Sequence, residues 1–133
     1  MMMAGLIILT SCGDDPKPPE IGFQTETSEI LEGNETTISL SQALPSGVTP
    51  TYTITGTATE TDDFTYTVSP DGSLAISVID DFTYDPDETI VFTLTSLGTG
   101  ATIGLKKTHT ITIKETPLTV EFQSISGTRT EGQ

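Results

Sequence analysis

The sequence predicts an all-β protein built as a seven-stranded antiparallel β-sandwich. Threonine is the first sign, because it occupies 27 of the 133 positions and β-branched residues favour strands over helices. Twelve glycines and eight prolines supply the turns that such a fold needs. Apolar residues recur with a period of two along the chain, and no helical period of any length is present.

Seven segments alternate between apolar and polar residues, as strands with one buried face do. Their expected ranges are 21–30, 36–42, 51–55, 64–68, 73–79, 89–95 and 107–114. Pro70-Asp71-Gly72 forms a turn between the fourth and fifth strands, because proline fixes φ and glycine tolerates a positive φ. One apolar face per strand implies two sheets that bury these faces against each other.

The charge of the chain excludes one class of partner. The formal net charge is −14, with only five Lys and Arg residues, whereas a nucleic-acid binder needs a basic patch. We therefore expect no nucleic-acid partner. An acidic surface is compatible with cation binding and also with a merely solvated surface, and composition alone leaves both open.

The N-terminal segment predicts export and anchoring. The apolar run MMMAGLIILTS precedes Cys12, the single cysteine, and is too short to span a bilayer but suits a secretory signal. Leu9-Thr10-Ser11-Cys12 resembles a bacterial lipobox, which implies a signal peptide over residues 1–12 and lipidation of Cys12. No Lys or Arg precedes the apolar run, which departs from the lipoprotein pattern.

Residues 13–20 predict a tether to that anchor. Gly13-Asp14-Asp15 resembles the surface-export signal of Bacteroidetes lipoproteins, and the prolines that follow are typical of a stiff linker. Together these features predict a lipid-anchored protein of the outer membrane or cell surface. A single cysteine also excludes an internal disulfide and a cysteine-based zinc cluster.

A weak internal repeat indicates a second domain. Residues 23–34 read FQTETSEILEGN and residues 122–133 read FQSISGTRTEGQ, with Phe-Gln and Glu-Gly in common at an offset of 99 residues. This offset equals one sandwich plus a short joint at Thr116-Pro117. We therefore expect one complete domain over residues 21–116 and the start of a second copy over 117–133. The alternative is a chance similarity in a tail.

Acidic residues gather in the links between the expected strands. The link after the fifth strand holds five carboxylates within nine residues: Asp80, Asp81, Asp85, Asp87 and Glu88. Asp62 and Asp63 precede the fourth strand, Glu32 follows the first, and Glu115 ends the seventh. Because consecutive strands alternate in direction, these groups should converge at one end of the sandwich.

Such a convergence favours a bound cation. Two carboxylates about 5 Å apart at an effective dielectric constant near 20 repel by roughly 3 kcal/mol, and a domain is stable by only about 5–15 kcal/mol. Calcium suits an all-oxygen loop site, because it accepts about 6–8 oxygen ligands in flexible geometry. Magnesium retains more water, and zinc prefers His or Cys.

Several ordered motifs resemble the Calx-β domain, a module named from the regulatory region of the sodium–calcium exchanger. They are Gly56-Thr57-Ala58, Asp63-Phe64, Ile79-Asp80-Asp81, Asp85-x-x-Glu88 and Phe92-x-Leu94. The resemblance covers residues 21–116. It implies an immunoglobulin-like sandwich with calcium at one end, of a kind that also occurs in integrins, adhesion proteins and bacterial surface proteins.

The resemblance also implies a set of calcium ligands: Glu32, Asp63, Asp80, Asp81, the backbone carbonyl of Thr83, Asp85, Glu88 and Glu115. Asp85 stands where the family often has Glu, so this shorter side chain is expected to act through water. The acidic run after the last strand is reduced to Lys114-Glu115-Thr116, where Lys114 is expected to repel an ion. We therefore expect one or two weakly bound ions and regard Asp87 as a bystander.

No catalytic arrangement stands out. His109 alternates with inward apolar residues and is expected to be a core or edge histidine, and no acid–base pair in a cleft is evident. We expect a non-enzymatic surface module whose calcium-dependent stiffening serves adhesion or matrix contact with an extracellular protein or carbohydrate. The alternatives are a metal-free spacer and an accessory domain of a larger secreted enzyme.

Overall fold

A computed structural model describes residues 15–117, 119–121 and 132. The predicted signal peptide with Cys12 lies outside the described residues, as does most of the predicted second copy over 117–133. Within the described part, none of the regular elements is a helix. A helix long and apolar enough to cross a membrane is accordingly not found there.

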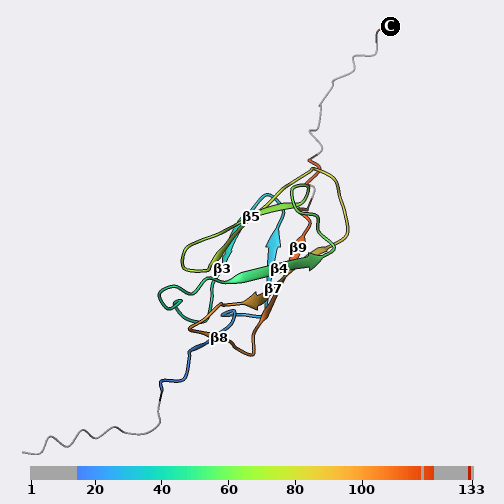
Figure 1. Ribbon diagram of the computed structural model, residues 1–133. Helices are drawn as coiled ribbons and strands as arrows, with labels where there is room; N and C mark the ends of the chain where they lie inside the picture. The colour runs from blue at the N-terminus through green and yellow to red at the C-terminus, as the bar shows by residue number, and fades with distance from the viewer. Residues whose placement is uncertain (1–14, 118, 122–131, 133) are drawn as a thin grey trace, which may run out of the picture.

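Nine strands form three sheets within these residues (Figure 1). The strands are β1 (Glu20–Ile21), β2 (Thr27–Leu31), β3 (Glu35–Ile38), β4 (Thr51–Gly56), β5 (Phe64–Val68), β6 (Leu74–Val78), β7 (Glu88–Ser96), β8 (Thr102–Ile103) and β9 (Thr108–Lys114). A four-stranded sheet in the order β2-β9-β7-β4 packs on a three-stranded sheet in the order β3-β6-β5, and β1 pairs with β8. The predicted sandwich is confirmed.

The first predicted strand, 21–30, is divided in two. Phe23 is 1% exposed and bridges to Leu40, so the chain bends here to seat that ring in the core. β1 pairs with β8, which lies between the sixth and seventh expected strands, 89–95 and 107–114. The sequence predicted an entirely antiparallel sandwich, but β2 runs parallel to its neighbour β9.

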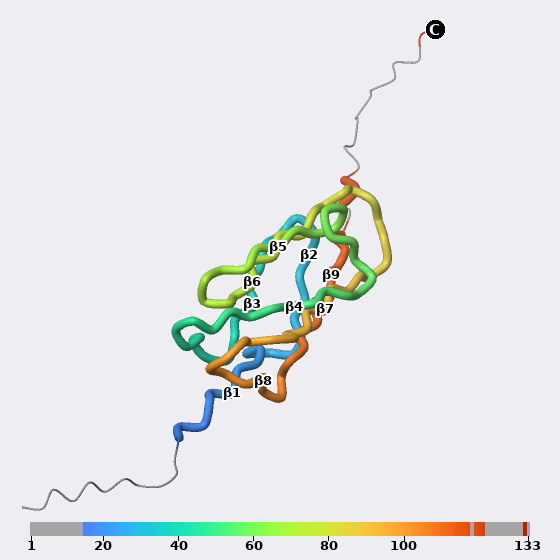
Figure 2. The backbone as a smooth tube through the Cα atoms, viewed as in Figure 1, coloured from blue at the N-terminus to red at the C-terminus, as the bar shows by residue number. Residues whose placement is uncertain are grey.

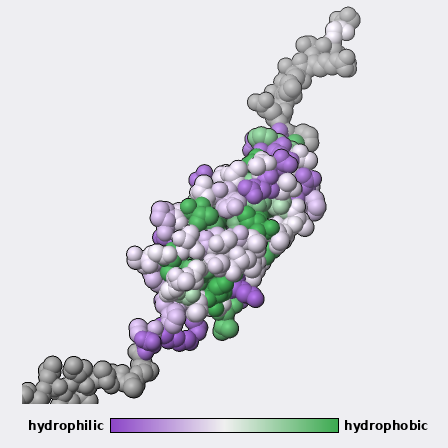
Figure 3. Space-filling view, viewed as in Figure 1, coloured by the Kyte–Doolittle hydropathy of each residue, from purple (hydrophilic) through white to green (hydrophobic). Residues whose placement is uncertain are grey.

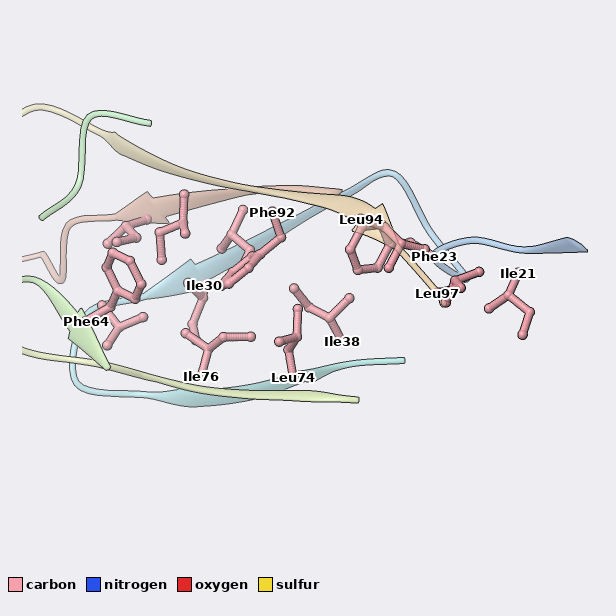
Figure 4. Close-up of a cluster of buried hydrophobic side chains, with 14 of the residues drawn as sticks. Ile21, Phe23, Ile30, Ile38, Phe64, Leu74, Ile76, Phe92, Leu94 and Leu97 are labelled. Carbon is pink, nitrogen blue, oxygen red and sulfur yellow. The ribbon is translucent and has the colours of Figure 1, made fainter. Parts of the chain in front are cut away.

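The core lies between the two main sheets. Inward side chains on β7 alternate with outward ones, and Ile90, Phe92 and Leu94 are at most 1% exposed. They meet the inward side chains of the other sheet, among them Leu74 and Ile76 (Figure 4). Burial of each such side chain contributes about 1.5–3 kcal/mol to folding.

Threonines fill the outer face of the four-stranded sheet. In the register of its strands, Thr93 lies beside both Thr53 and Thr108. The register also pairs Thr89 with Thr112 and Thr27 with Thr110. Cross-strand threonine pairs stabilise a sheet by about 0.2–1 kcal/mol each, which accounts for part of the abundance of this residue.

His109 is a core residue, as the sequence predicted. It is 1% exposed, its Nδ1 lies 2.7 Å from the Thr25 carbonyl oxygen, and its Nε2 lies 2.8 Å from Ser28 Oγ. Because a carbonyl only accepts hydrogen bonds, Nδ1 carries a proton and donates to Thr25, and Nε2 shares a hydrogen bond with the Ser28 hydroxyl. The ring thereby ties β9 to the segment that leads into β2.

Strand direction brings the acidic links to one end. β2, β4, β6 and β9 finish at the end where β3, β5 and β7 begin, as their pairing directions require. Figure 2 shows the links at 57–63 and 79–87 gathered at this end, from which the C-terminal segment leaves. The expected convergence of the links is therefore present.

Candidate metal centre

The acidic pole is the end of the sandwich that carries the eight predicted ligands. Five of them are half-buried: Glu32, Asp63, Asp80, Glu88 and Glu115. Asp81, Thr83 and Asp85 are exposed. Figure 3 shows hydrophilic surface at this end of the molecule.

Glu32 and Glu115 form the first group of the pole. They follow two parallel strands whose last pair is Leu31 with Lys114, and the Glu32 amide donates to the Lys114 carbonyl oxygen at 3.1 Å. Partial burial, together with the negative charges of Glu115, Asp81 and Asp80, raises the pKa of Glu32 to about 7. A hydrogen bond between the Glu32 and Glu115 carboxyl groups acts in the same direction.

Asp63 and Glu88 form the second group. Glu88 begins β7, and Asp63 immediately precedes β5. Partial burial, the charges of Asp63 and Asp85 and a hydrogen bond to Asp63 raise the pKa of Glu88. Glu115 raises the pKa of both Glu32 and Glu88, so it joins the two groups electrostatically.

The loop that positions Asp63 is fastened to the start of β7. Gly56 has φ +131°, and the amides of Thr57 and Ala58 both donate to the Thr89 carbonyl oxygen, at 3.0 and 3.1 Å. Asp63 Oδ2 in turn accepts from the Thr59 amide at 2.6 Å. These bonds hold Asp63 beside Glu88 through the fold of the loop.

Asp80 and Asp81 each use one oxygen to shape the next loop. Asp80 Oδ1 accepts from the Phe82 amide at 2.9 Å, and Asp81 Oδ1 accepts from the Thr83 amide at 2.8 Å. Phe82 adopts φ +61°, which is unusual for a residue with a side chain. One carboxylate oxygen of each aspartate thus organises the chain of this loop.

Lys114 turns toward other carboxylates. Its Nζ forms an ion pair with Asp87 and lies 3.9 Å from Glu29 Oε1. The repulsion expected from Lys114 is therefore offset by these two negative charges. Asp87, the expected bystander, is held in this pair.

The donor set of the pole matches calcium in chemistry. Its groups offer carboxylate and backbone oxygens, the ligands that calcium prefers. A recess of about 140 Å³ opens between the loops and is lined by Glu32, Asp80, Thr83 and Glu115 among others. Across residues 15–117, 119–121 and 132, however, no three acidic, histidine or cysteine side chains converge closely enough to hold a metal ion. Binding of an ion would therefore require these side chains to change conformation.

The sequence did not indicate which residues hold the predicted calcium ligands in position. Thr89 anchors the Asp63 loop through its carbonyl and hydroxyl groups. Gly33 packs against Asp80, since a Cβ added there would lie 3.4 Å from the Asp80 Cβ. The Glu-Gly sequence signalled a turn at Gly33, but nothing in the sequence linked that turn to Asp80.

Comparison with solved structures identifies known domains with a similar fold. No family model matches the chain, and no curated protein matches it. The apo form of the Calx CBD1 domain superposes with a TM-score of 0.62 and 19% identity, over 76% of this chain and all of that one. CBD12 from CALX1.2 and the calcium binding domain CBD12 of CALX1.1 give TM-scores of 0.59 and 0.57 and identities of 20% and 21%.

This chain spans 44% of each CBD12 chain, and each match covers 72% of this chain. At these identities the similarity shows the fold alone. The domain therefore has the Calx-β fold that its motifs predicted.

Replacement of Glu32 by glutamine should stabilise the metal-free protein at neutral pH. The folded-state pKa of Glu32 is raised from 4.5 to about 7, so its ionisation opposes folding progressively as pH rises from about 4.5 to 7. After allowance for partial exposure, we expect a gain of about 1 kcal/mol at pH 8 and none at pH 4. Urea unfolding in calcium-free buffer measures this. An equal effect at both pH values would contradict the electrostatic account.

Proposed function

We propose that the acidic pole binds calcium and that the bound ion stiffens the domain. The observation that carries this proposal is the gathering of half-buried carboxylates, among them Glu32, Glu88 and Glu115, at one end of the sandwich. Burial and the neighbouring negative charges raise the pKa of Glu32 there. Calcium would supply the missing positive charge. The residues that would hold it are the predicted ligands Glu32, Asp63, Asp80, Asp81, Thr83, Asp85, Glu88 and Glu115.

The position of these residues explains what would be stiffened. They lie after β2, β6 and β9 and before β5 and β7, so both main sheets contribute. Glu115 is followed directly by Thr116-Pro117, where the chain leaves the domain. An ion held at the pole would fix these segments relative to one another and limit the bending of the chain at its exit.

The setting proposed for this module is a lipid-anchored surface protein. The lipobox-like Cys12 and the acidic, proline-containing tether support that setting, and the repeat over 117–133 supports a neighbouring Calx-β domain. Two of the similar structures are the paired domains CBD12. Calcium-dependent stiffening of such an array would serve adhesion or contact with an extracellular protein or carbohydrate.

One observation favours a second candidate, a metal-free spacer. In the described residues the carboxylates do not converge into a group of three that could hold a metal ion. In a spacer, the acidic pole would provide only solubility, and the fold would hold another module away from the membrane. The two candidates differ in a single measurable property, calcium affinity.

Calorimetric titration with calcium distinguishes the two candidates. We expect saturable binding of one or two ions that releases protons near neutral pH, because the pKa of Glu32 is raised to about 7 and this group must ionise to act as a ligand. Titrations in buffers of different ionisation enthalpy measure this release, which should be larger at pH 6 than at pH 9. Absence of binding at millimolar calcium would leave the spacer as the function.

A further inference from the structure

β4 leaves one edge of the four-stranded sheet open. It pairs with β7 on one side, and no strand among residues 15–117, 119–121 and 132 pairs with its other side. In Figure 1, β4 crosses the front of the molecule. Such an edge presents unpaired N–H and C=O groups, and native proteins usually protect it with charged residues, proline or a bulge.

Protection of the open edge of β4 is confined to its beginning, at Pro50 and Thr51. Residues 39–59 contain no charged side chain, in a chain with 19 acidic residues. The register shift against β7 falls between Thr51 and Tyr52 and leaves the rest of β4 regular. A hollow of about 420 Å³ adjoins the start of β4 and is lined by uncharged residues: Val48, Thr49, Pro50, Val68, Ser69 and Pro70. β4 and this hollow are therefore uncharged, although Asp71, next to Pro70, acts electrostatically on Tyr52.

The side chains of β4 are complementary to a second β4. Thr51, Thr53 and Thr55 are exposed, whereas Tyr52 and Ile54 pack against the core and are only half-buried. In an antiparallel pair centred on Thr53, threonine would meet threonine and Tyr52 would meet Ile54. Threonine already faces threonine within the sheet itself, where Thr53 lies opposite Thr93.

Charge selects the direction of such a pair. The acidic pole adjoins the Gly56 end of β4, because the Asp63 loop begins there. Antiparallel pairing would send the two poles to opposite ends of the assembly, whereas parallel pairing would bring them side by side. With a net charge of −14 on each chain, repulsion favours the antiparallel arrangement.

We propose that two copies of this chain associate through antiparallel pairing of β4 with β4 about a two-fold axis at Thr53. The two four-stranded sheets then form one continuous sheet across the interface. A two-fold contact of this kind uses the same edge on both copies and closes at the dimer. The association does not require calcium, so it is independent of the function proposed above.

Cysteine cross-linking tests the register. Cys12→Ser is used throughout, so that each variant has a single cysteine. Directly opposed Cβ atoms lie about 4.5–5.5 Å apart, close to the reach of a disulfide. Mild oxidation should convert Thr53→Cys into a covalent dimer and leave the control Thr55→Cys as single chains, because Thr55 would face Thr51. Equal cross-linking of both variants, or none of Thr53→Cys, would contradict the proposed register.

Sedimentation equilibrium tests the association without cross-linking. The Cys12→Ser chain should reach twice the single-chain mass of 14.1 kDa as its concentration rises. Thr53→Lys would place two lysines opposite each other and should raise the dissociation constant at least about tenfold. Thr93→Lys is the matched control, because Thr93 shares the outer face but lies on the interior strand β7. A single-chain mass at millimolar protein would overturn the proposal.

Discussion

Replacement of Gly56 by alanine should cost the domain about 3 kcal/mol or more of its free energy of unfolding. Gly56 has φ +131°, a conformation that side-chain-bearing residues rarely adopt. A Cβ at this position would lie 2.1 Å from the Thr89 carbonyl oxygen, well inside contact distance. That oxygen belongs to the backbone of β7, so it cannot move aside as the end of a side chain could.

Urea unfolding of Gly56→Ala measures this cost, with Gly47→Ala as the control. Gly47 also has a positive φ, +82°, but a Cβ there would meet nothing within 4 Å. The control therefore carries backbone strain without the clash and should lose only about 1 kcal/mol. Equal losses in the two variants would show that the contact with Thr89 is not a constraint on the fold.

Calcium should stabilise the domain by about 2.7 kcal/mol at a free concentration one hundred times the dissociation constant. The expected stabilisation arises because only the folded state places the predicted ligands at one end of the sandwich, so calcium would bind the folded chain and not the unfolded one. Thermal unfolding in chelator and in millimolar calcium measures it, with magnesium as the ion control. We expect a calcium-specific rise of several degrees in Tm.

Asp81→Asn should abolish most of that rise. Asparagine retains an oxygen that can accept from the Thr83 amide, so the loop keeps its shape while the pole loses one negative charge. Glu26→Gln is the matched control, because the exposed Glu26 precedes β2, about 17 Å along the strand from the pole. A Tm rise that is equally reduced in both variants would indicate general charge screening rather than a site.

Periodicity was sufficient to predict most of the fold. Five of the expected strands match β4, β5, β6, β7 and β9 to within two residues at each end. Alternation of apolar residues such as Ile90, Phe92 and Leu94 reports a buried face directly. The break between β1 and β2 could not be predicted in this way, because it depends on where Phe23 finds space in the tertiary core.

The gathering of acidic residues at one end was predictable from the sequence, but the arrangement of their side chains was not. Strand direction alone brings Glu32, Asp63, Glu88 and Glu115 to one end, and the structure places them there. Their separation into two groups joined by Glu115 depends on side-chain direction and burial, which sequence spacing does not determine. The ion pair between Lys114 and Asp87 could not be predicted either, because 27 residues separate the two in the chain.

The most direct test of the calcium site is a ¹⁵N NMR titration of the chain with calcium, which reports where an ion binds. We predict saturable shifts of the amides in residues 32–34, 57–63, 79–88 and 115–117, and little change at the opposite end, in residues 45–48 and 70–73. Spectra that do not change with calcium, or shifts spread evenly over the surface, would contradict a calcium site at the acidic pole.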